Sequence, residues 1–269
     1  QAIAVAGGAG GGDQIYVDDV FSTFLYEGNG STQSINNGID FSGEGGLVWI
    51  KRRDSSNGHF LVDTERGRAS NLNSTSTSAA GTSSANRDLV SFNNNGFTVG
   101  AAQYESLNAS GADQVSWSFR KAPGFFDVVT YTGNGTSGRT VAHSLGSTPG
   151  MIVIKSTSNS ESWQVWHRSV TGNLELDNTG AVNSSSVRVT AVSSTDFTLS
   201  TFNTSNANGQ TYVAYLFAHD DQSFGTGSDE AIIKCGSFSS NSSGYFTVSL
   251  GFEPQFLLIK STGSGDWFI

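Results

Sequence analysis

The stretch Met151-Ile152-Val153-Ile154-Lys155 decides the fold of this chain, because related stretches stand before and after it. They are Leu47-Val48-Trp49-Ile50-Lys51 and Phe256-Leu257-Leu258-Ile259-Lys260. The three stretches begin at intervals of 104 and 105 residues (151 minus 47 and 256 minus 151), which is the size of one small domain. A recurrence at so regular an interval indicates a tandem repeat.

Other features recur in step with these stretches. A Tyr-x-Gly-Asn-Gly-Ser/Thr motif stands at residues 26–31 and again at 131–136. After each repeated Lys comes a short polar turn, and an aromatic residue follows it at nearly equal distance: Phe60, Trp163 and Trp267. This order of apolar run, polar turn and aromatic residue predicts a β-hairpin in each copy.

The apolar patterning favours two layers of strands in each copy. Residues 151–154 and 212–217 are nearly continuous apolar runs, which is typical of strands covered on both faces in the middle of a sheet. Residues 187–190 and 197–200 alternate apolar with polar, as strands do when one face meets water. No amphipathic helical stretch intervenes, and a β-helix would repeat at shorter intervals. We therefore expect an all-β chain of tandem antiparallel β-sandwich repeats, jelly-roll-like, of about 105 residues.

The repeat divides the chain into four predicted parts. They are a Gly/Ala-rich N-terminal arm (1–20), β-sandwich repeat 1 (21–124), β-sandwich repeat 2 (125–229) and a partial β repeat 3 (230–269). Short linkers between the copies favour a rod or a layered assembly. We also expect a long surface loop at 69–86, where Ser, Thr and Asn crowd together. A partial repeat leaves strand edges open. We therefore predict that additional residues of the protein, or neighbouring subunits, cover these edges.

Composition narrows the classes of function. A formal charge of −9 repels phosphate backbones, so no nucleic-acid partner is expected. The basic run Lys51-Arg52-Arg53 is better explained as a solvated strand end. Cys235 is the single cysteine, which excludes an intrachain disulfide and a zinc site built on several thiolates. The sequence shows neither a signal peptide nor an apolar run long enough to span a membrane, so no membrane insertion is expected.

Candidate sites for chemistry are weak. The four histidines are scattered without the spacing of zinc ligands, and the pairs Asp18-Asp19 and Asp220-Asp221 lack the loop that calcium sites require. No nucleophile elbow or dinucleotide-binding fingerprint occurs. We therefore predict no catalytic residue, no cofactor, no metal site and no enzymatic activity.

Two tryptophans could stack on a sugar ring. Trp163 and Trp166 lie three residues apart, so in a strand they point to opposite faces. Because Trp163 belongs to the repeated hairpin pattern, we assign it to the core. Trp166 remains as the candidate surface contact.

The quoted motifs also resemble a known family. The segments DVFSTFLYEGNGSTQSINNGIDFSGEGGLVWIKRR (19–53), TYTGNGTSGRTVAHSLGSTPGMIVIK (130–155) and YVAYLFAHDD (212–221) are similar to a repeated domain of unknown function. That domain occurs in virion structural proteins, often tail or fibre proteins, of marine bacteriophages, including cyanophages. The resemblance covers nearly everything after Val20 and carries no catalytic residues with it.

The resemblance implies a virion component that acts by assembly. Its implied partners are other virion proteins and copies of itself as a homo-oligomer, with contact to a host surface glycan as a further expectation. The alternative is a secreted carbohydrate-binding or adhesive β-sandwich module, and a glycan-degrading enzyme ranks third. Binding to a glycan array would favour the carbohydrate-binding module, and release of reducing sugar would favour the glycan-degrading enzyme.

Overall fold

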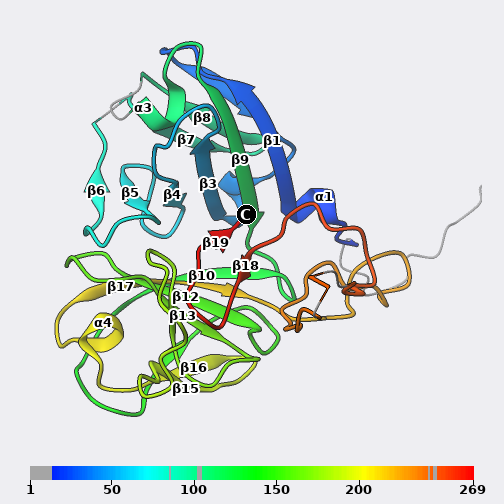
Figure 1. The fold of residues 1–269 in the computed structure, drawn as a ribbon. Helices are drawn as coiled ribbons and strands as arrows, with labels where there is room; N and C mark the ends of the chain where they lie inside the picture. Colours follow the sequence, from blue (N-terminus) through cyan, green and yellow to red (C-terminus); the bar gives the residue numbers. More distant parts are fainter. Residues whose placement is uncertain (1–13, 85, 102–104, 242, 245–246) are drawn as a thin grey trace, which may run out of the picture.

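The computed structural model describes residues 14–84, 86–101, 105–241, 243–244 and 247–269. Figure 1 shows two β assemblies stacked on each other, one built from the blue to green part of the chain, which includes β9 (Asp113–Arg120), and one from the green to yellow part that follows. Most of the predicted N-terminal arm, residues 1–13, lies outside the described residues.

The first assembly, here called the first sandwich, has two antiparallel sheets. Its large sheet has the order β1 (Phe21–Glu27), β9 (Asp113–Arg120), β3 (Gly46–Arg52), β4 (Phe60–Asp63), β5 (Ser70–Asn73) and β6 (Gly81–Thr82). Its small sheet has the order β2 (Gln33–Asn36), β8 (Gly96–Val99) and β7 (Leu89–Asn93). A buried core of Ile35, Val48, Ile50, Phe97 and other apolar residues lies between the two sheets.

The second sandwich has the same plan. Its large sheet has the order β10 (Phe126–Thr132), β17 (Thr211–Phe217), β12 (Met151–Ser156), β13 (Gln164–His167) and β14 (Leu174–Glu175). Its small sheet has the order β11 (Arg139–Ala142), β16 (Asp196–Leu199) and β15 (Val189–Val192). Strands matched by their order in the chain thus occupy matching places in the two sandwiches.

Helices are short, as the composition led us to expect. They are α1 (Val17–Val20), α2 (Phe41–Glu44), α3 (Glu105–Asn108) and α4 (Asn203–Asn206). Within the part of the chain that the structure describes, no helix is long and apolar enough to cross a membrane. The predicted all-β sandwich class is confirmed.

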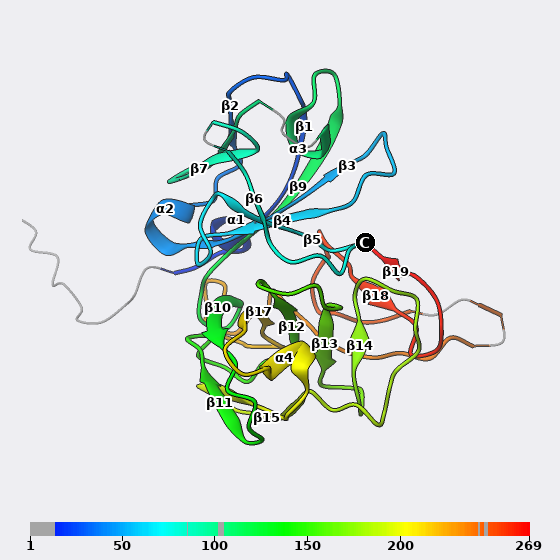
Figure 2. The same cartoon turned by 90° about the vertical axis from the view of Figure 1, so that its left-hand side faces the viewer.

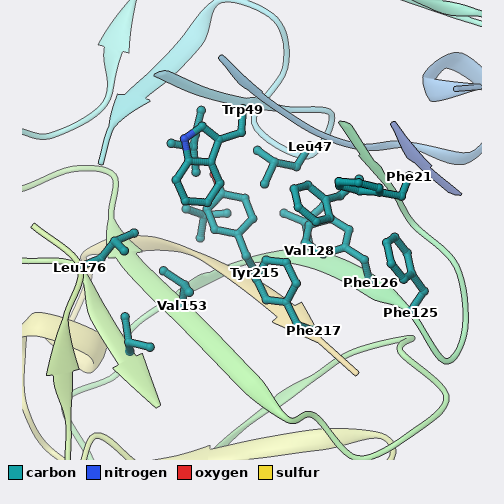
Figure 3. Close-up of a cluster of buried hydrophobic side chains, with 14 of the residues drawn as sticks. Phe21, Leu47, Trp49, Phe125, Phe126, Val128, Val153, Leu176, Tyr215 and Phe217 are labelled. Atoms are coloured by element: carbon teal, nitrogen blue, oxygen red, sulfur yellow. The ribbon is translucent and has the colours of Figure 1, made fainter. Parts of the chain in front are cut away.

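A third, central core joins the two sandwiches. Leu47, Trp49 and Phe119 of the first large sheet share one buried cluster with Val153 and Tyr215 of the second. Figure 3 shows Leu47 and Trp49 on one side of this cluster and Val153 and Tyr215 on the other, between strands of the two sheets. Strands β3 and β12 are therefore covered on both faces. Six side chains from the apolar runs that the sequence indicated as strands are all buried, namely Trp49, Ile50, Ile152, Ile154, Tyr215 and Phe217.

The C-terminal segment contributes one two-stranded hairpin, β18 (Ile259–Lys260) and β19 (Trp267–Phe268). It stands where the repeat predicted one, and the described residues between 230 and 258 form no regular strand. Figure 2 shows this C-terminal hairpin beside β14 of the second sandwich.

Two details of the sequence interpretation are wrong. The predicted surface loop at 69–86 contains β5 and β6 and buries Asn71 and Ser83. Its polar side chains bond one another: Asn71 donates to Ser83 (2.9 Å), and Ser83 donates to Asp88 (2.6 Å). A polar composition therefore does not place the whole segment in water. Asn71 and Ser83 are buried with their hydrogen bonds satisfied internally, whereas Thr75, Thr77 and Ser78 are exposed.

The second error concerns the alignment of the hairpin aromatics. Phe60 pairs with Ile50, whereas the residue that pairs with Ile154 is Gln164. Trp163, one position earlier, is therefore the counterpart of His59 rather than of Phe60. The paired residues lie ten positions apart in both hairpins, so the two turns have the same length, and aligning the aromatic residues by type misplaced Trp163 by one position.

Candidate functional site: the junctions between successive units

The first junction is where the β12–β13 hairpin of the second sandwich meets the segment that follows β5 of the first. Trp163 is fully buried there, and its indole Nε1 donates to the carbonyl oxygens of Asn73 (3.0 Å) and Ser76 (3.1 Å). The Lys155 ammonium donates to the carbonyl oxygen of Thr77 (3.1 Å). Side chains of one unit thus donate hydrogen bonds to backbone carbonyls of its neighbour.

A backbone bond completes the first junction. The amide of Ala80 donates to the carbonyl oxygen of Thr157 (3.0 Å), two residues after Lys155. The segment from Asn73 to Ala80 is therefore held at both ends by the hairpin that packs against it.

The second junction, between the second sandwich and the C-terminal hairpin, repeats these three contacts. Trp267 Nε1 donates to the carbonyl oxygen of Glu175 (2.8 Å), the last residue of β14, just as Asn73 is the last residue of β5. Lys260 Nζ lies 3.4 Å from the carbonyl oxygen of Thr179, and the amide of Val182 donates to Thr262 (3.0 Å).

The donors and acceptors of the two junctions occupy matching places. Trp267, Lys260 and Thr262 are the counterparts of Trp163, Lys155 and Thr157 in the predicted repeat. Thr77 and Thr179 each follow the last residue of the acceptor strand by four positions. The C-terminal hairpin therefore sits on the second sandwich as the second sandwich sits on the first.

The residues just before the C-terminal hairpin also reach the first sandwich. The Phe256 ring lies 5.5 Å from the ring of Phe119, 5.7 Å from that of Trp117 and 6.0 Å from that of Phe21, measured between centroids. Aromatic pairs at such distances add to the energy of apolar burial. Three successive parts of the chain thus contribute to the central core.

A buried polar network fixes the two large sheets relative to each other. Asp63 of β4 accepts from the hydroxyl of Tyr215 in β17 (2.8 Å) and from Arg66 Nε (2.6 Å), and Arg66 Nη2 also lies 3.1 Å from the Tyr215 hydroxyl. Burial raises the pKa of Tyr215 well above its ordinary value, so the phenol keeps the proton that it donates to Asp63. The Arg66 and Asp63 side chains are 5% and 0% exposed, which makes this a fully desolvated ion pair.

The residue that the sequence singled out lies away from both junctions. Trp166 is half-buried in β13, opposite Ile152, and packs against the core of the second sandwich rather than the central core. Trp163 lies in the central core, so the two tryptophans do face opposite sides. Whether Trp166 contacts a ligand stays a prediction.

Lys51, Arg52 and His59, which the sequence also offered as candidates, have local partners. The Lys51 ammonium donates to the carbonyl oxygen of Ser55 (2.6 Å), and Arg52 pairs with Asp54 (2.6 Å). His59 accepts from Trp49 at 3.0 Å. Burial raises the pKa of Cys235 to about 12. Among the described residues, no three His, Cys, Asp or Glu side chains gather as a metal site would need.

Sequence reasoning missed the junction residues themselves. The sequence pattern explains Lys51 as part of a solvated strand end and places Trp163 in the core, and it indicates no contact between units for Lys155, Lys260 or Trp267. One signal in the sequence could have identified the junction residues. A lysine and a tryptophan recur together in the second and third predicted copies, as Lys155 with Trp163 and as Lys260 with Trp267, while few other charged residues recur.

Comparison with known proteins adds one finding. Residues 17–269 match a family described as a domain of unknown function, DUF7483, while no curated protein and no solved structure shows a significant match. The match spans both sandwiches and the C-terminal hairpin. The chain belongs to the DUF7483 family.

Proposed function

We propose that this chain is a structural protein that acts by assembly, without catalysis, in the tail, fibre or a related appendage of a bacteriophage virion. The observation that carries the assembly part is the recurrence of one set of hydrogen bonds at two successive junctions. The virion part rests on the resemblance of the repeated segments to phage tail and fibre proteins.

The repeated contact supports assembly for a geometric reason. At each junction one surface of a unit, the hairpin, meets a different surface of the preceding unit, the segment after β5 or β14. Such a head-to-tail contact can be repeated by further units, whereas a contact between two identical patches is used up after one pair. A protein built in this way is suited to a shell or a fibre.

Exposed apolar side chains offer a surface at which other protein chains could bind. Five of the large ones lie in the C-terminal segment, with exposed fractions of 43% to 63%: Phe238, Val248, Leu257, Phe268 and Ile269. Apolar surface gathered in one segment favours contact with other protein. We propose copies of this chain and other virion proteins as the partners.

Two measurements test the proposal. Mass spectrometry of purified phage particles should detect the chain in many copies per particle. Light scattering of residues 1–269 should show oligomers that Phe268→Ser weakens, while Leu25→Ser, a matched change at an exposed leucine of β1 in the first sandwich, leaves them intact. Absence from particles would overturn the virion part, and a monomer at every concentration would overturn self-assembly through this segment.

A further inference from the structure

Residues 232–235, here called the docked segment, pack against the second sandwich without forming a strand of either of its sheets. Ile232 and Ile233 lie against the central core, and Cys235 is buried in it. The docked segment begins the part of the chain that leads from the second sandwich to the C-terminal hairpin.

Three hydrogen bonds join the docked segment to the residues that follow β17. The amide of Asp220 donates to the carbonyl oxygen of Ile233 (2.9 Å). The amide of Cys235 donates to Nδ1 of His219 (3.1 Å), and its thiol donates to the carbonyl oxygen of Ala218 (3.4 Å). Of these three acceptors, only the imidazole of His219 changes its protonation state near neutral pH.

The docked segment fits closely against His219. A Cβ atom on Gly150 would lie 2.6 Å from the Cβ of Cys235 and 2.7 Å from the Cβ of His219. Real Cβ atoms do not approach one another so closely, so this arrangement requires glycine at position 150. The imidazole and the Cys235 amide are therefore held side by side by packing as well as by their hydrogen bond.

The imidazole of His219 has a hydrogen-bond donor on each side. Its Nδ1 faces the amide of Cys235, and its Nε2 lies 2.5 Å from Nη1 of Arg168. A neutral imidazole has one nitrogen without a hydrogen, so it can accept from one of these donors. A protonated imidazole carries hydrogen on both nitrogens and can accept from neither. Uptake of a proton therefore removes the bond to the docked segment.

The surroundings of His219 oppose its protonation while the docked segment is in place. Burial lowers the pKa of His219, and the positive charges of Arg168 and Lys234 act in the same direction. The carboxylate of Asp220 opposes these charges, but it also pairs with the Lys234 ammonium at 3.4 Å. His167 is a further basic neighbour, whose own pKa is lowered by burial and by the charges of Arg168 and His219. Departure of the docked segment removes Lys234 and part of the burial, so it favours the protonated imidazole.

We propose that His219 is an acid-sensitive switch, which holds the docked segment while its imidazole is neutral and releases the segment when the imidazole is protonated. The stabilisation is fully present above about pH 6.5, where the imidazole is neutral whether or not the segment is docked, and it is lost as the pH falls below that value. Release exposes Cys235 and the apolar side chains of Ile232 and Ile233, so acid changes the surface that the second sandwich offers to other protein. The inference goes beyond the proposed function and does not depend on assembly.

The test measures the reactivity of Cys235, the single cysteine, in the whole chain at about pH 7.5 and about pH 5. The reagent is dithiodipyridine, which reacts with thiols at both pH values. Each rate is divided by the rate of the chain unfolded in urea at the same pH, which cancels the pH dependence of the thiol itself. The ratio should rise about tenfold at the lower pH, the effect of one lost hydrogen bond. Circular dichroism should remain that of the folded chain, so that the rise reports a local release.

Three variants separate His219 from other titrating groups. His219→Gln keeps an oxygen acceptor for the Cys235 amide but does not titrate, so its ratio should be the same at both pH values. His59→Gln is the matched control, because His59 also accepts from an N–H group but lies in the first sandwich, and it should show the parental rise. Arg168→Gln, at an exposed position, removes one of the opposing positive charges and should show a smaller rise than the parent.

The switch is overturned by an equal ratio at both pH values in the parent, by a parental rise in His219→Gln, or by loss of the rise in His59→Gln. If His219→Gln does not fold, Arg168→Gln decides, and a rise as large as that of the parent would contradict the role given to His219.

Discussion

Asn206 makes the same hydrogen bonds to residues 133–136 that Asn108 makes to residues 28–31. Its Oδ1 accepts from the amide of Asn134 (3.0 Å), and its Nδ2 donates to the carbonyl oxygens of Thr136 (2.8 Å) and Ser200 (2.9 Å). Asn108 bonds to the equivalent atoms in the first sandwich, at 3.1, 2.6 and 2.7 Å.

This relationship explains the repeated Gly-Asn-Gly motif. A Cβ atom on Gly133 would lie 2.3 Å from the carbonyl oxygen of Ala207, and one on Gly28 would lie 2.2 Å from that of Ala109. The second glycine of each motif has a φ of 70°, which side chains rarely adopt. The motif is therefore a turn shaped to wrap a buried asparagine.

The first prediction concerns this buried asparagine. Asn108→Ala and Asn206→Ala each remove an acceptor and two donors that no water can replace, because both residues are fully buried. Each change should lower the free energy of unfolding by roughly 1 to 3 kcal/mol or more. Chemical denaturation measures this. The control Asn94→Ala, at an exposed turn position, should stay within about 0.5 kcal/mol of the parent, and equal losses at all three sites would contradict the role assigned to the motif.

The second prediction concerns the buried ion pair between the two sandwiches. Arg66→Met leaves the Asp63 carboxylate with one donor fewer in a dry site, so it should cost about 3 to 5 kcal/mol. Tyr215→Phe removes one neutral donor and should cost less, roughly 1 to 2 kcal/mol. Thermal unfolding should remain a single transition in both variants. Separate melting of the two sandwiches in the parent chain would show that the central core does not couple them.

The third prediction is a pH dependence that arises from His59. Burial lowers the pKa of His59 to about 4, and the positive charge of Lys51 acts in the same direction. Between about pH 6.5 and pH 4 the unfolded chain takes up a proton that the folded chain does not, so stability should fall as the pH falls through this range. Protonation at Nδ1 would also remove the acceptor of the Trp49 indole.

Denaturation at several pH values measures the effect of His59. His59→Gln offers Trp49 an oxygen acceptor but does not titrate, so the variant should show a flatter dependence between pH 4 and 6.5. An unchanged slope would assign the dependence to other groups.

The fourth prediction concerns Cys235. Its side chain is buried, its thiol lies 3.4 Å from the carbonyl oxygen of Ala218, and burial raises its pKa to about 12. Because the thiolate is the reactive form, iodoacetamide at pH 8 should label the native chain far more slowly than the chain in urea. Equal rates would mean that the segment around Cys235 does not pack as described.

The sequence predicted the units better than it predicted how they join. Strands such as Met151–Ile154 can be recognised from the sequence. Alternating apolar and polar residues indicate a strand covered on one face, and a short continuous apolar run indicates one covered on both. The junctions depend on backbone carbonyls, such as those of Asn73 and Glu175, which have no signature in the sequence. The contact between His219 and Cys235 likewise joins residues that are separated in the chain and belong to no sequence motif. The segment 69–86 was misjudged because its polar groups bond one another.

The exchange of two indole protons tests the central claim, that successive units dock through the same contacts. Nuclear magnetic resonance can follow the Nε1–H of Trp163 and Trp267, each assigned with a Trp→Phe variant. Because both donate to carbonyl oxygens of the preceding unit, both protons should exchange much more slowly than in the unfolded chain. A protected Trp163 beside a Trp267 that exchanges at the unfolded rate would contradict the account, since the second junction would then not repeat the first.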